Sequence, residues 1–377
     1  MSVSSSHSVV MQRCYAADAR RTQDSFVSPE FTVMRPLLSS AVVCALALAL
    51  AQSMPLHARD LRITGAGASF PFPVYSAWFR HYNRETPGVR IDYQSVGSGA
   101  GVRNLINRTV DFAASDAAMT DEEIDQVDGG VVILPMTAGE IVLAYNLRGV
   151  DELRLPRAVY PLIFAGEITR WNDPKILEAN PDIDLPNRQI TVVRRSDSSG
   201  TTFVFTQHLS AINERFREEI GTGTSVAWPG KSNFVGAPRN DGVAALVSNT
   251  PGAIGYMEYF FASRSNTPVA MLENAAGNFV VPDEESGQAA LASADFSTDD
   301  LRIWVTDPSD PGAYPITTLT WMLFYREHGN DAIAEALRDF VTWAVGEEGQ
   351  AMAADLSFVP LPEVLVERVL AQVPDIQ

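Results

Sequence analysis

The sequence predicts an α/β protein whose strands are mostly parallel. The main observation is a pattern of strand, polar glycine-containing loop and helix that recurs at least three times. The length of 377 residues predicts two or three domains, and 46% hydrophobic with 20% charged residues is an ordinary globular composition. Ligands of such sheets bind beyond the carboxyl ends of the strands, so function is expected in the loops.

The first unit of the pattern begins with a short strand over 61–64. It runs into a loop of small residues and glycines, Gly65 to Phe70. A helix is predicted over 71–85, because its apolar residues recur every four positions and form one stripe. Pro71 and Pro73 fit only in the first turn of that helix.

Two further strands follow along the chain. Residues 89–93 alternate as a strand and lead into the glycine-rich loop 97–101, after which a helix is predicted through 102–106. Residues 111–115 form the next predicted strand, which ends at Asp116. An acidic side chain at the end of a buried strand is a candidate for function.

The last clear unit lies in the middle of the chain. A strand is predicted over 190–193, followed by the polar loop Arg194 to Thr201 and by a helix through 205–209. Three turns are also predicted, the first of them leading into a helix: 171–174, 222–224 and 240–242.

These loops have the composition of an anion site. Each offers backbone N–H groups at the start of a helix together with a Ser or Thr hydroxyl. A helix N-terminus carries roughly half a positive charge, so several converging termini attract an anion. Arg195 adds a planar guanidinium suited to a tetrahedral oxyanion. The net charge of −18 excludes a basic nucleic-acid footprint but leaves a local anion pocket open.

Each feature also has a purely structural explanation. Ser69 and Ser98 could be plain N-caps, and Asp116 could cap the helix that begins near Thr120. Arg195 could be a surface arginine paired with Asp197. The occurrence of several such loops in one chain favours the anion site.

Other chemistries have little support. Gly65-Ala66-Gly67 lacks the third glycine of a dinucleotide fingerprint, and neither a P-loop motif nor a G-x-S-x-G elbow occurs. Two cysteines, Cys14 and Cys44, cannot form a disulfide framework or a four-cysteine zinc site. We therefore predict no metal and no cofactor. Three histidines follow the N-terminal 58 residues: His81, His208 and His328. They show no metal-ligand spacing, and each is expected on the surface or on a helix face.

The N-terminus has the pattern of an export signal. The apolar run 37–51 is shorter than the roughly 20 residues of a membrane span but suits a signal peptide. We predict a signal peptide over 34–58, cleaved after Ala51 or Ala58; the alternative is a buried helix. Residues 1–33 are too long and too mixed in charge for its start, so we interpret them as a mis-called start or an extension.

Five segments, in order, closely resemble the periplasmic phosphate-binding protein of the Pst-type ABC phosphate importer. The similarity runs from about Ile63 to near the C-terminus. Its segments are TGAGASFPFPVY (64–75), VGSGAGV (96–102), DFAASDA (111–117), VVRRSDSSGTTFVFT (192–206) and PGAIGYMEY (251–259).

The resemblance implies a two-lobed, type II Venus-flytrap fold with two crossovers between the lobes. Lobe one would be 59–136 plus 315–377, and lobe two would be 137–314. Phosphate would lie between them, with Asp197 paired to Arg195. The implied ligands are Ser69, the Phe70 backbone, Ser98, Asp116, Arg195, Ser199, Gly200 and Thr201.

This chain departs from the family pattern at two of these positions. Ser69 stands where the family often has Thr, which keeps the hydroxyl. Ser198 stands where Gly is common, so the path of that loop is open.

The implied function is high-affinity binding of inorganic phosphate in the periplasm by a monomer that is not an enzyme. The protein would deliver phosphate to an inner-membrane ABC permease with its ATPase. Asp116 would accept the proton that phosphate carries, which favours phosphate over the alternatives sulfate and molybdate. A secreted phosphate-ester hydrolase is a further alternative, but it needs a metal cluster or an activated nucleophile.

Overall fold

The computed structural model describes residues 60–298 and 300–377, which belong to one compact unit. The predicted extension, 1–33, and the predicted signal peptide, 34–58, lie outside the described residues. Within the described part, no helix is both long and apolar enough to cross a bilayer.

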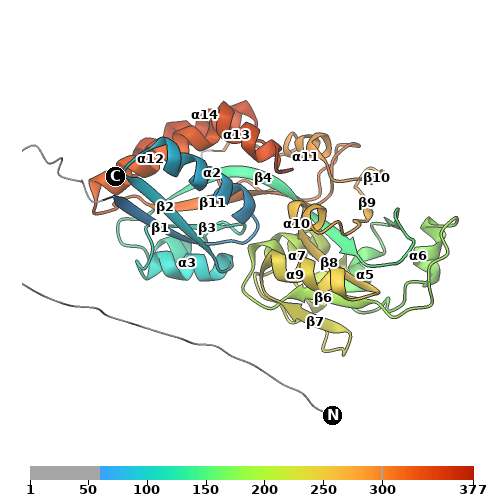
Figure 1. The fold of residues 1–377 in the computed structure, drawn as a ribbon. Coiled ribbons are helices and arrows are strands. Elements are labelled where there is room, and N and C mark those ends of the chain that lie inside the picture. The colour runs from blue at the N-terminus through green and yellow to red at the C-terminus, as the bar shows by residue number, and fades with distance from the viewer. Residues whose placement is uncertain (1–59, 299) are drawn as a thin grey trace, which may run out of the picture. The chain divides into compact units, whose positions relative to one another are not determined.

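The central feature is an eight-stranded sheet in the order β2-β1-β3-β11-β4-β8-β6-β7 (Figure 1). A small three-stranded sheet has the order β10-β9-β5. The strands of the large sheet are β1 (Leu61–Gly67), β2 (Val89–Ser95), β3 (Phe112–Ser115), β4 (Val131–Tyr145), β6 (Thr191–Arg195), β7 (Phe234–Ala237), β8 (Ala253–Glu258) and β11 (Thr317–Tyr325). Those of the small sheet are β5 (Arg154–Leu155), β9 (Met271–Glu273) and β10 (Phe279–Val280).

Strand β4 joins two halves of the large sheet. It pairs with β11 as far as Glu140, which lies opposite Thr317, and with β8 from Ile141, which lies opposite Glu258. We call β2, β1, β3, β11 and the start of β4, with their helices, the first half. The end of β4, with β8, β6, β7 and their helices, is the second half. The two-lobed fold thus rests on one strand shared by both halves.

The sheet is more mixed than the local pattern predicts. Parallel pairs join β1 to β2 and β3, and β6 to β7 and β8, as the strand–loop–helix units require. The two long strands β4 and β11 run antiparallel to each other, and each is antiparallel to its other neighbour, β8 and β3 respectively. Both are buried along their whole length, which removes the alternation that would reveal a strand.

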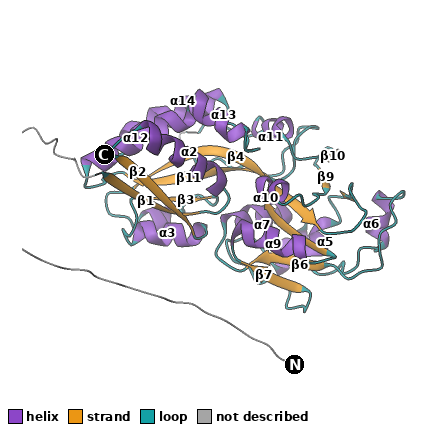
Figure 2. Ribbon diagram, in the orientation of Figure 1, coloured by secondary structure: helices purple, strands orange, loops and turns teal. Residues whose placement is uncertain are grey.

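The helices cover the sheet on both faces (Figure 2). In the first half, α3 lies on one face and α2 with α12 to α14 on the other (Figure 1). The helices are α2 (Phe72–Glu85), α3 (Ser98–Ile106), α4 (Asp121–Ile124), α5 (Tyr160–Phe164), α6 (Pro174–Ala179), α7 (Gly200–Ile212), α8 (Glu214–Glu219), α9 (Arg239–Asn249), α10 (Tyr259–Arg264), α11 (Glu284–Leu291), α12 (Asp331–Val345), α13 (Glu347–Ala354) and α14 (Glu363–Gln372). A short 3₁₀ turn follows at Val373–Asp375.

Most predicted elements are confirmed, with two differences near the loops. Helix α3 begins at Ser98, so the predicted glycine-rich loop is largely the first turn of the helix. A Cβ on Gly101 would lie 2.5 Å from Gly67 Cα, so this glycine lets α3 lie directly on β1.

The prediction of a turn at 240–242 is wrong. Residues Asn240 to Gly242 form the first turn of α9, which follows Pro238. Asn-Asp-Gly favours turns locally, but Asn240 is buried and bonded to other parts of the chain, so tertiary contacts decide its conformation.

Candidate functional site

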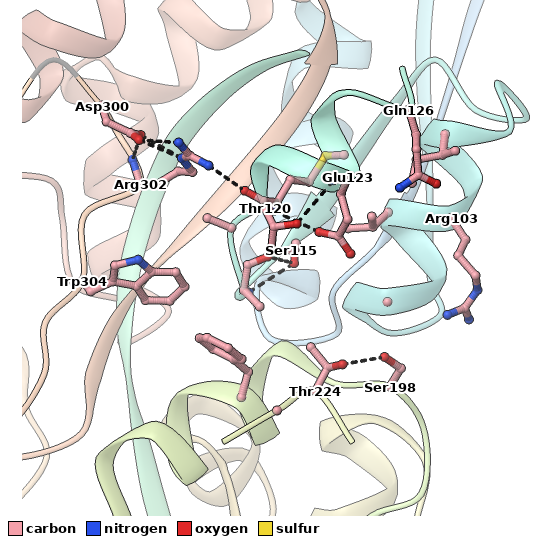
Figure 3. Close-up of a pocket in the computed structure, with 18 residues that line it drawn as sticks. Arg103, Ser115, Thr120, Glu123, Gln126, Ser198, Thr224, Asp300, Arg302 and Trp304 are labelled. Atoms are coloured by element: carbon pink, nitrogen blue, oxygen red, sulfur yellow. Dashed lines mark hydrogen bonds and ion pairs between the residues drawn. The ribbon is translucent and has the colours of Figure 1, made fainter. Parts of the chain in front are cut away.

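A pocket of about 730 Å³ opens beside the carboxyl ends of β3 and β6. Figure 3 shows Ser198 bonded to Thr224 on one side of it and Arg302 bonded to Asp300 on another. Ser198 and Ser115, which line this pocket, are the chain neighbours of Ser199 and Asp116. The pocket therefore adjoins the loops in which an anion site is predicted, although none of the eight predicted ligands lines it.

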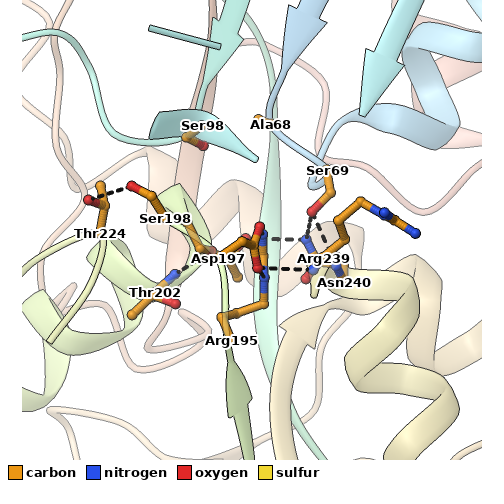
Figure 4. A network of polar contacts seen from close by, with 12 residues as sticks. Ala68, Ser69, Ser98, Arg195, Asp197, Ser198, Thr202, Thr224, Arg239 and Asn240 are labelled. Atoms are coloured by element: carbon orange, nitrogen blue, oxygen red, sulfur yellow. Dashed lines mark hydrogen bonds and ion pairs between the residues drawn. The ribbon is translucent and has the colours of Figure 1, made fainter. Parts of the chain in front are cut away.

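All eight residues predicted to bind phosphate are buried, and Figure 4 shows Ser69, Ser98 and Arg195 of this set near one another. Each side chain among them is at most 4% exposed. They come from the ends of strands and the starts of helices: Ser69 and Phe70 after β1, Ser98 at the start of α3, Asp116 after β3, Arg195 at the end of β6, and Ser199, Gly200 and Thr201 at the start of α7. We call this set the candidate anion site.

Hydrogen bonds hold the two halves of the chain together at this site. Asn240 donates from Nδ2 to Ser69 Oγ at 3.0 Å and to Thr201 Oγ1 at 3.2 Å. Its backbone N–H also donates to Ser69 Oγ, at 3.1 Å. Thr201 Oγ1 in turn donates to Asp116 Oδ2 at 3.3 Å. Ser69 and Asp116 belong to the first half, so these contacts cross between the halves.

Asp116 is a buried carboxylate held by hydroxyl groups. Thr320 Oγ1 donates to its Oδ1 at 2.9 Å, and its backbone N–H donates to Ser98 Oγ at 3.3 Å. Burial raises the pKa of Asp116 from 3.8 to about 6, although the Thr320 bond, the Arg195 charge and the Thr201 bond lower it in part. At neutral pH the group is therefore an acceptor, and it gains a proton in mildly acidic solution.

Asp116 does not act as a helix cap. Helix α4 is capped by Thr120, whose hydroxyl accepts from the Glu123 N–H while the Glu123 side chain accepts from the Thr120 N–H. The explanation of Asp116 as a cap is therefore wrong.

Arg195 and Asp197 form a bidentate ion pair. Arg195 donates from Nε to Asp197 Oδ1 at 2.8 Å and from Nη2 to Asp197 Oδ2 at 2.5 Å. The Arg195 side chain is only 1% exposed, so its explanation as a surface arginine is wrong. Its third nitrogen, Nη1, donates to Thr201 Oγ1 at 3.4 Å, on the side of the candidate anion site. The pair thus aims one guanidinium nitrogen at that site.

Asp197 also receives a backbone donor. The N–H of Arg239 donates to Asp197 Oδ1 at 3.0 Å. Burial would raise the pKa of Asp197, but the Arg195 hydrogen bonds and charge outweigh burial and hold it below its usual value. Asp197 is therefore ionised at neutral pH and positions Arg195.

The start of α7 approaches the first half very closely. Ser199 is the N-cap of this helix, because its hydroxyl accepts from the Thr202 N–H at 3.0 Å. A Cβ on Gly200 would lie 2.5 Å from Ser98 Oγ and 2.7 Å from Asp116 Cβ. Glycine is thus required for the approach that brings the positive end of α7 next to Asp116.

Neither Ser69 nor Ser98 caps a helix. The N-cap of α2 is Pro71 and that of α3 is Gly97, and neither makes a side-chain cap bond. The two serine hydroxyls instead accept bonds from Asn240 and from the backbone of Asp116. The N-cap explanation of these serines is therefore wrong.

The loop at Ser198 is well defined although glycine is common there in the family. The Ser198 hydroxyl donates to Thr224 Oγ1 at 3.0 Å, and its carbonyl accepts from the Gly99 N–H at 3.2 Å. A Cβ on Gly99 would lie 2.0 Å from Ser198 Oγ. The serine thus packs against the start of α3 and adds another contact between the halves.

Sequence reasoning missed two residues of this network, Asn240 and Thr320. Asn240 lies in a segment that reads locally as a turn and carries no anion motif. Thr320 belongs to β11, a fully buried strand that also carries buried Thr317 and Thr318. Hydroxyls in an otherwise apolar buried strand were a usable signal, because buried polar groups need partners.

The three histidines of the described residues, His81, His208 and His328, make their contacts outside this network. His208, on α7, is 3% exposed and shares a 2.8 Å hydrogen bond with the Tyr160 hydroxyl. Burial lowers its pKa from 6.5 to about 3, with the Arg157 charge adding to the effect. In residues 60–298 and 300–377, no group of three or more His, Cys, Asp or Glu side chains could hold a metal ion.

Comparison with known proteins gives a consistent result. The PBP superfamily domain matches residues 46–348. The phosphate-binding protein PstS of Xylella fastidiosa is 39% identical over 316 residues, which are 83% of this chain and 85% of that protein. The PstS protein of Pasteurella multocida is 39% identical over 313 residues, covering 82% of this chain and 89% of that one.

Solved structures share the fold. A high affinity periplasmic phosphate-binding protein with phosphate bound superposes with a TM-score of 0.67 at 23% identity, covering 83% of this chain and 94% of that one. A phosphate-binding protein from Stenotrophomonas maltophilia superposes with a TM-score of 0.65 at 23% identity, with the same coverage. Because both structures are only 23% identical to this chain, the similarity shows the two-lobed binding-protein fold alone.

Proposed function

This chain belongs to the PstS family of phosphate-binding proteins within the PBP superfamily, and on that premise we propose that it binds inorganic phosphate for import by an ABC transporter. The proposed ligands are the eight residues of the candidate anion site. The observation that supports the proposal most is that a single buried acceptor, Asp116, lies among hydrogen-bond donors. These donors are the start of α7, serine and threonine hydroxyls and the Arg195 guanidinium.

The donors would bind the phosphate oxygens. The N–H groups of Phe70, Gly200 and Thr201 lie at starts of helices or just before them, where backbone donors lack helical partners. Arg195 would donate from Nη1, the guanidinium nitrogen that is not bonded to Asp197. Each hydrogen bond to a charged group is worth about 1.5–3 kcal/mol, and exclusion of water as the halves close strengthens it.

Asp116 would supply the selectivity. Phosphate keeps at least one proton at neutral pH and can donate it to an ionised carboxylate. Sulfate has the same shape but no proton, so its oxygen would face the Asp116 carboxylate without a donor between them. This acceptor favours phosphate over the alternative ligands sulfate and molybdate.

Catalysis is not part of the proposal. A hydrolase needs a metal or an activated nucleophile, whereas the Ser199 hydroxyl accepts from the Thr202 N–H as a helix cap. In the described structure, the side chains of Asp116 and Arg195 are hydrogen-bonded to hydroxyls and to a carboxylate, a set suited to binding.

Titration calorimetry on protein stripped of ligand by partial unfolding and dialysis tests the proposal directly. We expect tight binding of phosphate with one site per chain, and no heat from a generic phosphomonoester beyond that of contaminating phosphate. A folded, stripped protein that fails to bind phosphate would refute the proposal. Equal binding of sulfate would favour the general oxyanion binder.

We also propose that the protein acts in the periplasm as a monomer and passes phosphate to an inner-membrane permease with its ATPase. Export would use the signal peptide 34–58, and the moving lobes would be 59–136 with 315–377 and 137–314. N-terminal sequencing of exported protein is expected to begin after Ala51 or Ala58. Exported protein that retains residues 1–33 would contradict this part of the proposal.

A further inference from the structure

A second groove, of about 670 Å³, crosses between the halves beside the candidate anion site. It lies next to the Ser69–Asn240 contact, because α2 begins three residues after Ser69 and α9 begins at Arg239. We call it the arginine–aromatic groove. Its principal lining residues are Phe72 and Arg80 of α2, Tyr93 of β2, Arg239 of α9, and Phe260 and Arg264 of α10.

The groove combines apolar surface with unpaired positive charge. Phe72 is 37% exposed and stacks on Tyr93, with the ring centroids 6.4 Å apart. Arg80 and Arg264 are exposed, and neither has an ion-pair or hydrogen-bond partner in the part of the chain that the structure describes. In a chain of net charge −18, this is a local basic and aromatic surface. Aromatic residues and arginine are the types enriched in protein interfaces.

The charges indicate the chemistry of the occupant. Arg239 is already paired with Asp241 at 3.0 Å, whereas Arg80 and Arg264 are free to pair with carboxylates from outside. The aromatic rings between them would contact apolar side chains. Charge complementarity therefore favours a protein segment that carries Asp or Glu beside apolar residues.

The groove is connected to the candidate anion site through Arg239. Its backbone N–H holds Asp197, the partner of Arg195, and the next residue, Asn240, holds Ser69 of the other half. Arg239 has φ of +58°, a strained conformation for a residue with a side chain. Figure 4 shows its side chain extending away from Asp197. A partner that contacts the Arg239 side chain would therefore act on the residue whose backbone N–H holds Asp197 in its pair with Arg195.

The groove also depends on the arrangement of the two halves. Phe72 and Arg80 belong to the first half, and Arg239, Phe260 and Arg264 belong to the second. Separation of the halves would break the Ser69–Asn240 bonds and divide the groove. A partner that needs both walls therefore recognises the closed form.

We propose that the arginine–aromatic groove is the surface on which the transport partner docks, through acidic side chains set beside apolar ones. This inference rests on the proposed function, because it takes the partner to be the importer that receives phosphate. Arg80 and Arg264 attract the partner, the aromatic residues bury apolar surface, and Arg239 passes the contact to the Arg195–Asp197 pair.

Charge reversal on the two free arginines tests the proposal. The double variant Arg80→Glu/Arg264→Glu is compared with Arg84→Glu, a matched control one turn further along α2 that is exposed and does not line the groove. The two single variants are measured alongside. The readouts are uptake of radiolabelled phosphate by cells that contain the importer and only the tested form of this protein, calorimetric affinity for phosphate, and the melting temperature.

We expect uptake by the double variant to fall at least about tenfold, because like charges would then face each other at the interface. Its affinity for phosphate should stay within about twofold, because neither arginine belongs to the candidate anion site. Each single variant should lose part of the uptake, and Arg84→Glu should behave as wild type. This pattern would support the groove as the docking surface.

Three results would overturn the proposal. Full uptake by the double variant would exclude the groove as the docking surface while leaving phosphate binding intact. A matching loss of phosphate affinity would show that the arginines act on the ligand. Arginine-dependent sedimentation of the wild type with anionic lipid vesicles that lack the importer would indicate a membrane surface as the occupant. Failure of the wild type to bind phosphate is a separate result and would refute the proposed function as well.

Discussion

Asp116 offers the sharpest test of how the site selects its ligand. The carboxylate is buried and accepts from Thr320 at 2.9 Å and from Thr201 at 3.3 Å. A sulfate oxygen placed against it would find no donor. Sulfate gains a donor there only when Asp116 takes up a proton, and with a pKa of about 6 this lowers its affinity about 30-fold at pH 7.5, which corresponds to about 2 kcal/mol. We expect a tenfold molar excess of sulfate to leave most of the phosphate bound in the wild type at pH 7.5.

The pKa of Asp116 makes this rejection depend on pH. With a pKa of about 6, the carboxyl is protonated in about 3% of molecules at pH 7.5 and in about 90% at pH 5. Only the protonated form can donate to sulfate, and apparent affinity scales with the competent fraction. Sulfate should therefore bind about 30-fold more tightly at pH 5 than at pH 7.5. Asp116→Asn should bind sulfate independently of pH and narrow the gap to phosphate, because its amide is a permanent donor.

Competition calorimetry at several pH values between 5 and 7.5 measures these effects. Thr320→Val is a useful second variant, because it removes a donor to Asp116 while Thr320 is not among the proposed ligands. Loss of that donor favours the neutral carboxyl, so the rise in sulfate affinity should shift to higher pH. Sulfate binding within tenfold of phosphate at pH 7.5, or a sulfate affinity that does not change with pH, would refute the reasoning.

Three further predictions concern Arg195 and Gly200 of the candidate anion site and the buried His208. Arg195→Ala should weaken phosphate binding about 10- to 150-fold, because one charged hydrogen bond is lost. Removing Asp197 as well should recover part of that loss. A calorimetric affinity of the single variant equal to that of the wild type would exclude Arg195 as a ligand. Gly200→Ala places a Cβ 2.5 Å from Ser98 Oγ of the other half, so the affinity for phosphate should fall about 5- to 150-fold. The melting temperature of the ligand-free form should not change, because the halves can separate. In the unfolded chain His208 binds a proton below about pH 6.5, whereas in the folded chain it does so only near pH 3. The free energy of unfolding therefore decreases as the pH falls through this window, by up to about 5 kcal/mol. Urea titrations at pH 7 and pH 4 measure the free energy of unfolding at each pH. His208→Gln should reduce the difference between the two values, and a difference equal to that of the wild type would contradict the assignment.

Local sequence patterns account for much of the fold and for most of the candidate site. Short-range chemistry is enough to place strand ends and helix starts, which is why the loops around Ser69, Ser98 and Ser199 could be recognised before the structure was known. The ordered motifs extended this to a two-lobed binding protein. They also indicated the set of residues that the structure buries together.

Contacts between distant segments were beyond such reasoning. Asn240 lies 171 positions from Ser69, and Thr320 lies 204 positions from Asp116. Nothing near Asn240 in the chain distinguishes a turn from the start of a helix that bridges two halves. The antiparallel placement of β4 and β11 likewise depends on packing, because both strands are buried on both faces and show no alternation.

The sequence by itself predicted which loops carry candidate anion-binding groups, Arg195 and Asp116 among them, and it indicated the family to which the chain belongs. The tertiary structure decided what state those groups are in. Burial of Asp116 among hydroxyls sets its pKa near 6, and the packing of Gly200 against Ser98 sets how closely the halves approach. Both effects depend on desolvation and contact distance, which arise only when segments far apart in the chain are brought together.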